Sequence, residues 1–240
     1  MSTHAFTVHT IDTAPEAARP IMNAVRRTLG QLPSAVGLMA ESPELLNGFL
    51  TANSIYESCG LDPVEREIVV LTVAGRNECH ICIAMHTATL TRLGAAPELI
   101  DALRGTNAAS GVGAGGAAGD VASGVGAGGE GGEGGEGGAG GVGGVGGAGG
   151  VGGVGGAGGV GAGGGTPLPD ERLEALRLFT LAVLDHRGAV PDEELSAFLA
   201  AGFQPRHALD VVLGVGTYTI STFANRLTRA PLGSPVPANA

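Results

Sequence analysis

The segment Asp62-PVEREIVVLTVAGRNECHICIAMHTATLTRL-Gly94 decides the fold of this 240-residue chain. It opens with Asp62 and Pro63, which suit the N-cap and the first position of a helix. Glu65 stands where a capping box places its acid. Few residues of this first helix are polar after Glu67, so we expect the helix to be largely buried. We expect residues 75–77 to break it.

The second half of the segment predicts another helix. Asn77 is expected to cap a helix over residues 78–93, which Gly94 closes. Helical periodicity continues on both sides, and no convincing alternation of period two appears, so the sequence predicts an all-α fold. The other predicted helices cover residues 15–29, 33–39, 42–56, 97–103, 169–186, 191–201 and 211–223, the last interrupted by Gly214 and Gly216.

Glycine dominates residues 111–165, in near-repeats of Gly-Gly-Val, Gly-Gly-Ala and Gly-Gly-Glu. Glycine loses the most backbone entropy on ordering, and no large side chain is present to offset that loss. We therefore predict a long disordered loop. It would separate an N-terminal helical part, residues 1–110, from C-terminal helices, residues 166–232, that complete the same domain. Residues 233–240 are predicted to be a flexible tail.

The charge pattern excludes several classes of partner. The formal net charge is −10, and no run of Lys or Arg occurs. Binding to phosphates or to an anionic membrane surface is therefore not expected, so neither nucleic acid nor membrane is a predicted partner. Residues 1–20 contain no secretory signal, and no stretch approaches a span of about 20 apolar residues. The sequence thus predicts a cytoplasmic protein.

Cys79, Cys82 and His86 carry the chemistry of the sequence. They lie three and four residues apart, so their side chains share one face of a helix. The cysteines also fall in the first turn, where the helix dipole favours a thiolate, although the charge of Glu78 acts against it. His86 can accept the thiol proton. A thiolate attacks an O–O bond, and a second cysteine converts the sulfenic acid into a disulfide that an external dithiol reduces.

Two other interpretations of this motif stay open. The cysteines and His86 could be buried packing residues. They could also hold zinc, with a fourth ligand from Cys59, Glu67, His80 or a distant histidine, but zinc sites usually draw their ligand pairs from two separate chain segments. We therefore expect no metal and no other cofactor. His80 is expected to be solvated, and Cys59 to be a passive thiol.

A family resemblance follows from three motifs. They are Asp62-Pro63-x-Glu65-x-Glu67, Asn77-x-Cys79-x-x-Cys82-x-x-x-His86 and Leu93-Gly94. This combination resembles the carboxymuconolactone decarboxylase-like superfamily, and more closely its alkylhydroperoxidase D-like, peroxidase-related branch. The resemblance is clear over residues 44–103, and residues 169–232 resemble the C-terminal helices of longer members. It implies an AhpD-like helical bundle that assembles as a homo-oligomer, commonly a trimer or hexamer.

The resemblance also implies roles for the site residues. Cys82 resembles the peroxidatic cysteine and Cys79 the resolving cysteine, while His86 and Glu67 resemble members of a proton relay. The implied activity is that of a thiol-dependent peroxidase, with a peroxide substrate and a dithiol or thioredoxin-like reductant. Where the family often has His or Tyr before the second cysteine, this chain has Ile81, which predicts a shortened relay. The alternatives are a lactone enzyme of the decarboxylase type and a non-enzymatic helical scaffold that presents the Gly-rich loop.

Overall fold

The computed structural model describes residues 5–109 and 166–233. Within these ranges the chain forms α-helices and one short 3₁₀-helix and no β-strand, which confirms the all-α prediction. The elements are η1 (Glu16–Ala18), α1 (Arg19–Leu29), α2 (Ser34–Met39), α3 (Pro43–Glu57), α4 (Pro63–Arg76), α5 (His80–Arg92), α6 (Pro97–Ala109), α7 (Glu171–Asp185), α8 (Asp192–Ala200) and α9 (Pro205–Leu227). The predicted loop at 111–165 and nearly all of the predicted tail lie outside the described residues.

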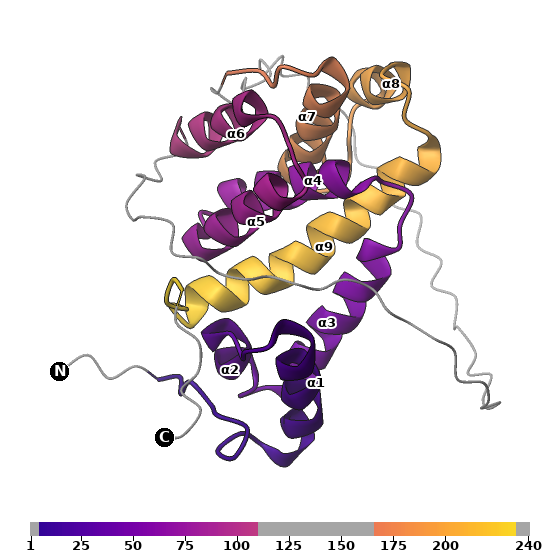
Figure 1. The fold of residues 1–240 in the computed structure, drawn as a ribbon. Helices are drawn as coiled ribbons and strands as arrows, with labels where there is room; N and C mark the ends of the chain where they lie inside the picture. The colour runs from indigo at the N-terminus through magenta and orange to yellow at the C-terminus, as the bar shows by residue number, and fades with distance from the viewer. Residues whose placement is uncertain (1–4, 110–165, 234–240) are drawn as a thin grey trace, which may run out of the picture.

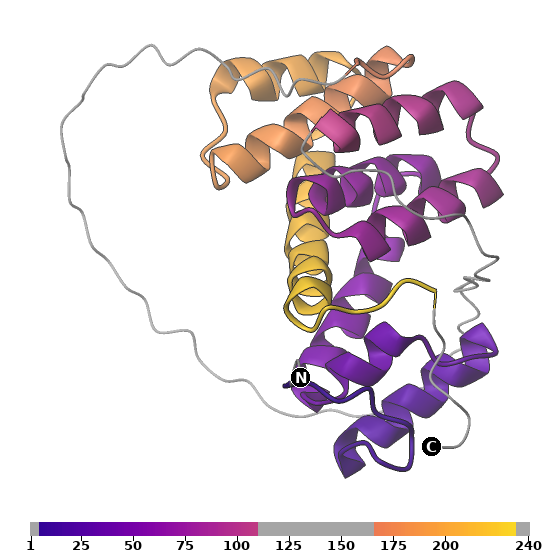
Figure 2. The same cartoon turned by 90° about the vertical axis from the view of Figure 1, so that its left-hand side faces the viewer.

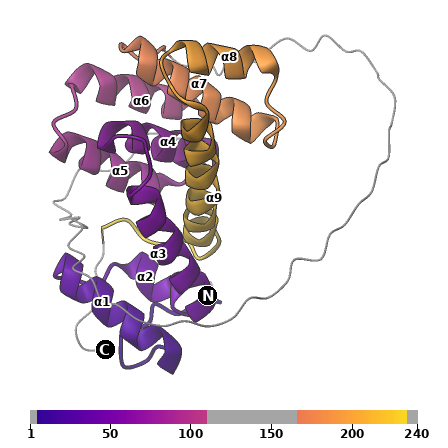
Figure 3. The same cartoon turned by 90° about the vertical axis from the view of Figure 1, so that its right-hand side faces the viewer.

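Helix α4 is the central element of the fold. Its residues 68–75 are buried, as its apolar sequence predicts, and α5, α7 and α9 all pack against it. In Figure 1, α9 runs diagonally through the molecule, with α4 and α5 on one side and α3 on the other. Figures 2 and 3 show α6, α7 and α8 gathered at one end of α9 and α1 and α2 at the opposite end, with α3 running beside α9. The fold thus places α5 next to the C-terminal half of α9.

The N-terminus of α4 is fixed by the predicted capping box. Asp62 Oδ1 accepts a hydrogen bond from the Glu65 backbone N–H at 2.8 Å, and Glu65 Oε2 accepts one from the Asp62 N–H at 3.0 Å. The other oxygen of Glu65 accepts a hydrogen bond from Arg172 Nε of α7 at 2.8 Å. The Arg172 guanidinium also lies 3.7 Å above the ring centroid of Phe203. Glu65 therefore both caps α4 and connects this helix to the C-terminal helices.

Helix α9 is continuous, so the predicted interruption at Gly214 and Gly216 is wrong. Gly214 lies where α9 crosses α3, and a Cβ added there would come within 2.7 Å of the Tyr56 ring. Glycine costs a helix interior about 1 kcal/mol relative to alanine, a cost that the packing of α9 on α3, α4 and α7 overrides.

Although α9 has 23 residues, none of the helices in the described part of the chain is long and apolar enough to cross a membrane.

The junction of α4 and α5 differs from the prediction. Gly75 lies inside α4, and Asn77 is the C-cap of α4 rather than the N-cap of α5. Glu78 adopts a positive φ of 51°, and Cys79 is the N-cap residue of α5. The Asn77 side chain instead donates a hydrogen bond to Thr222 Oγ1 of α9 at 2.9 Å. A contact with a distant helix thus outweighs the local capping preference of asparagine.

Candidate active site

Cys79 and Cys82 form a disulfide at the N-terminus of α5, with their Cα atoms 5.3 Å apart. Because Cys79 is the N-cap, Cys82 is the third residue of the helix. Both sulfurs therefore lie at the positive end of the helix dipole, as the sequence predicts. The two residues are only 1% and 3% exposed, and they pack with Ala35, Ala74 and Ile81. The pair is thus held in an apolar environment.

His86 and Glu67 form the second pair of the site. His86 Nδ1 lies 2.8 Å from Glu67 Oε2, so the ring and the carboxylate of α4 are hydrogen-bonded. The Tyr218 ring of α9 packs edge-on against His86, with 5.1 Å between centroids. Within the described residues no hydrogen bond joins His86 to either sulfur. The structure therefore brings the four candidate residues together as two adjacent pairs, one disulfide and one carboxylate–imidazole pair.

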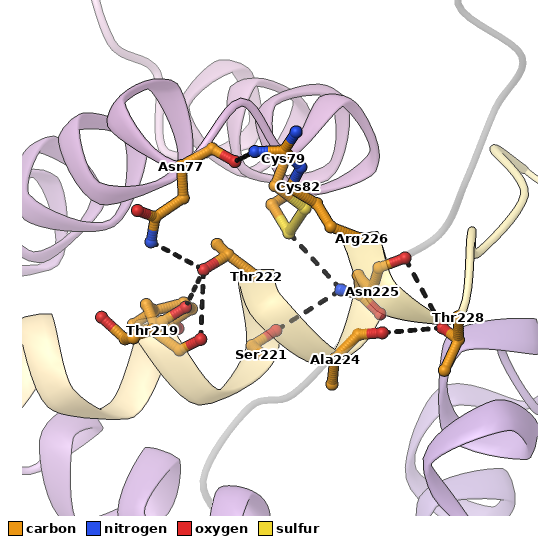
Figure 4. The surroundings of a disulfide bond; sticks show 11 residues. Asn77, Cys79, Cys82, Thr219, Ser221, Thr222, Ala224, Asn225, Arg226 and Thr228 are labelled. Atoms are coloured by element: carbon orange, nitrogen blue, oxygen red, sulfur yellow. Dashed lines mark hydrogen bonds between the residues drawn. A yellow bond between two sulfur atoms is a disulfide. The ribbon is translucent and has the colours of Figure 1, made fainter.

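Helix α9 supplies residues that the sequence analysis missed. Asn225 Nδ2 donates a hydrogen bond to Cys82 Sγ at 3.4 Å (Figure 4). The Tyr218 hydroxyl donates one to Asn53 Oδ1 at 2.8 Å, and burial raises the pKa of this phenol far above its usual range. A usable signal was present, because polar side chains recur at helical spacing on the buried face of this apolar helix. These residues are Thr217, Tyr218, Ser221, Thr222 and Asn225.

An open hollow of about 390 Å³ lies beside the disulfide. Its lining includes Cys79 and Ile81, but not Cys82, and Leu232 adds an apolar wall. Arg226, also in the lining, pairs with Glu78 at 3.1 Å. This ion pair offsets the Glu78 charge that acts against thiolate formation. The hollow therefore lies against Cys79, whose side chain is itself buried in the disulfide state.

Of the remaining candidate residues, His80 lines the hollow beside Cys79, whereas Cys59 lies apart from the site. His80 is exposed, as predicted. Cys59 is a free thiol at the end of α3, and burial raises its pKa, which lowers its thiolate fraction at neutral pH. Among the residues that the structure describes, no group of three or more His, Cys, Asp or Glu side chains is arranged to hold a metal ion.

Comparison with known proteins places this geometry in a family context. Residues 41–122 match the model of the Carboxymuconolactone decarboxylase family, and this range contains Glu67, Cys79, Cys82 and His86. No curated protein matches the sequence.

Two solved structures share the fold over nearly the whole chain. One is an alkylhydroperoxidase AhpD core, an uncharacterized peroxidase-related protein from Ralstonia eutropha JMP134, with a TM-score of 0.62, 17% identity and coverage of 95% of this chain and 92% of that chain. The other is an uncharacterized peroxidase-related protein from Silicibacter sp. TM1040, with a TM-score of 0.56, 14% identity and coverage of 98% and 93%. The family-model match agrees with the resemblance to the carboxymuconolactone decarboxylase-like superfamily, and the two solved structures confirm the predicted AhpD-like helical fold.

Proposed function

We propose that this protein is a thiol-dependent peroxidase that reduces a peroxide through a dithiol–disulfide cycle of Cys79 and Cys82. The observation that carries the proposal is the juxtaposition of two pairs on α5. A disulfide closes at the helix N-terminus, and the Glu67–His86 pair lies about one turn further along. The first pair suits electron transfer and the second suits proton transfer.

The cycle begins with the reduced pair. The Cys82 thiolate attacks one peroxide oxygen, the O–O bond breaks, and the alcohol or water leaves with a proton from His86. The Cys79 thiol then attacks the Cys82 sulfenic acid, which forms the disulfide and releases water. An external dithiol or thioredoxin-like protein donates two electrons to restore both thiols. Glu67 orients the His86 ring by holding Nδ1, which leaves Nε2 for the proton exchange.

The surroundings of the two sulfurs support different roles. Cys82 lies inside the first turn of α5 and receives the Asn225 N–H, both of which stabilise a thiolate. Cys79 lines the hollow, so we propose that an incoming reductant approaches the disulfide from the Cys79 side. The peroxide would reach Cys82 in the reduced state, when the two sulfurs are no longer bonded.

Stoichiometric oxidation tests the proposal. The full chain is reduced with a dithiol, desalted and treated with one equivalent of cumene hydroperoxide, and its thiols are then counted and mapped by mass spectrometry. We expect two of the three thiols to disappear, a Cys79–Cys82 disulfide to form and Cys59 to remain free, with full reversal by dithiol. Unreactive thiols contradict the proposal. Turnover of a lactone acid by protein with alkylated cysteines would support the decarboxylase alternative. Absence of both peroxide reduction and lactone turnover would support the scaffold alternative.

We also propose that the outer face of α9 is the contact of a homo-oligomer. Four apolar side chains on this face are exposed and lie four and seven residues on either side of Gly216: Leu209, Val212, Ile220 and Phe223. This symmetry lets two antiparallel copies of α9 pair about Gly216, with Leu209 of one copy facing Phe223 of the other and Val212 facing Ile220, as a two-fold contact allows. A hexamer built from two trimers has two-fold axes and can contain such a contact, whereas a single trimer has no two-fold axis.

Replacing Phe223 with Glu is expected to split the oligomer. Phe223 is 57% exposed, so the substitution leaves the core of one chain intact but places a charge in the proposed contact. Light scattering after size exclusion should show a smaller species with unchanged helical circular dichroism. Leu178→Glu on α7, at a residue 49% exposed, is the matched control and should keep the parent mass. An unchanged mass for F223E, or an equal loss in both variants, contradicts the α9 contact.

A further inference from the structure

The Asn225 side chain is only half satisfied in the disulfide state. The residue is 6% exposed, and its Nδ2 donates hydrogen bonds to Cys82 Sγ at 3.4 Å and to Ser221 Oγ at 3.5 Å. Its Oδ1 is buried and has no hydrogen-bond partner among the described residues. Figure 4 shows the amide pointing from α9 toward the sulfur pair. A disulfide sulfur carries no hydrogen, so it can accept from the amide N–H but cannot donate to the amide oxygen.

Reduction of the disulfide changes both sulfurs of this arrangement. A thiolate on Cys82 accepts a stronger, charge-assisted hydrogen bond from Nδ2 than a neutral sulfur does. Reduction also gives Cys79 an S–H donor, which the disulfide lacks. The stronger hydrogen bond to a Cys82 thiolate therefore favours the reduced pair over the disulfide.

No other described group can take over this role at Cys82. The Arg226 guanidinium on the same helix is held by the Asn77 carbonyl at 2.7 Å and by Glu78 at 3.1 Å. His86 is engaged with Glu67. Within the described part of the chain, Asn225 makes the hydrogen bond that reaches Cys82 Sγ.

We propose that Asn225 is a further catalytic residue, which stabilises Cys82 as the leaving thiolate when a dithiol reduces the disulfide. One thiolate of the dithiol attacks Cys79 Sγ, so a new S–S bond forms while the Cys79–Cys82 bond breaks. The electron pair of the broken bond stays on Cys82 Sγ, opposite the Asn225 N–H. The second thiol of the reductant then displaces Cys79 as a thiol and leaves as an oxidised disulfide. This inference rests on the proposed dithiol–disulfide cycle, but not on a peroxide being the oxidant.

The redox equilibrium tests the role of Asn225. Full-length wild type, Asn225→Leu and Asn225→Ala are equilibrated in glutathione buffers of graded potential, quenched by alkylation and quantified for the Cys79–Cys82 disulfide by mass spectrometry. Loss of the amide is expected to shift the equilibrium about tenfold toward the disulfide, which is a midpoint about 30 mV more negative for two electrons. Circular dichroism confirms folding, and the smaller Ala side chain serves if Leu does not fit.

Asn77→Leu is the matched control, because Asn77 also links this junction to α9 but binds Thr222 rather than sulfur. Its midpoint should equal that of wild type. Midpoints of both Asn225 variants that coincide with wild type, or a shift of equal size in N77L, overturn the proposal. If wild type fails to turn over peroxide while the Asn225 shift is present, the proposed peroxidase function fails and the role of Asn225 stands.

Discussion

Replacing Cys82 with Ser is expected to lower dithiol-dependent peroxide consumption by a factor on the order of 10³ or more. A serine hydroxyl is a poor nucleophile at neutral pH, and its oxygen can form neither a sulfenic acid nor a disulfide with Cys79. The bond between the two sulfurs shows that they come within reach of one another, so loss of either one ends the cycle. The measurement is the rate of cumene hydroperoxide loss at fixed dithiol concentration.

Two further cysteine variants make this experiment specific. Cys79→Ser should retain the first step and accumulate one sulfenic acid on Cys82, which dimedone labels and mass spectrometry locates. Cys59→Ser should turn over peroxide like wild type, because burial raises the pKa of that free thiol and it lies outside the site. Turnover that survives in C82S, or a sulfenic acid that forms there on Cys79, would show that Cys82 is not the peroxidatic residue.

Local sequence signals were sufficient for much of the fold. The start of α3 was predictable because Ser42 Oγ accepts from the Leu45 N–H, as the Ser-Pro-Glu pattern indicates. The start of α4 was predictable for the same reason, because its capping box involves residues only three apart. These interactions form within a single turn, so the sequence around them contains the whole signal.

The errors and omissions share a physical cause. Asn77 was predicted to cap α5, but its side chain binds Thr222, which is 145 residues away in the sequence. Asn225 was missed as a site residue because its contact with Cys82 spans 143 residues. For the cysteines and His86, helical spacing alone was enough to predict one shared face. The Glu67–His86 contact joins two helices, so only the family resemblance indicated it in advance.

The largest expected effect on stability is at Gly214, where replacement by Ala should lower the free energy of unfolding by about 2 kcal/mol. The added Cβ would lie 2.7 Å from Tyr56 Cε2, 2.8 Å from Cζ and 2.9 Å from the hydroxyl oxygen. The ring has little freedom to move, because Tyr56 is fully buried and its hydroxyl donates to the Arg66 carbonyl at 3.3 Å. Urea unfolding followed by circular dichroism measures the change.

Gly48→Ala on α3 is the matched control for this prediction. It makes the same substitution in a helix interior, but nothing lies within 4 Å of the new Cβ. It should therefore stabilise the protein by about 1 kcal/mol, through helix propensity alone. Opposite signs for the two variants would isolate the contact with Tyr56, whereas equal stabilisation would show that this ring is not fixed.

Because Tyr56 packs edge-on against Tyr218, and Tyr218 against His86, a displaced Tyr56 ring also disturbs the proton-transfer pair. Gly214 therefore connects the close crossing of α3 and α9 to the geometry of the candidate active site.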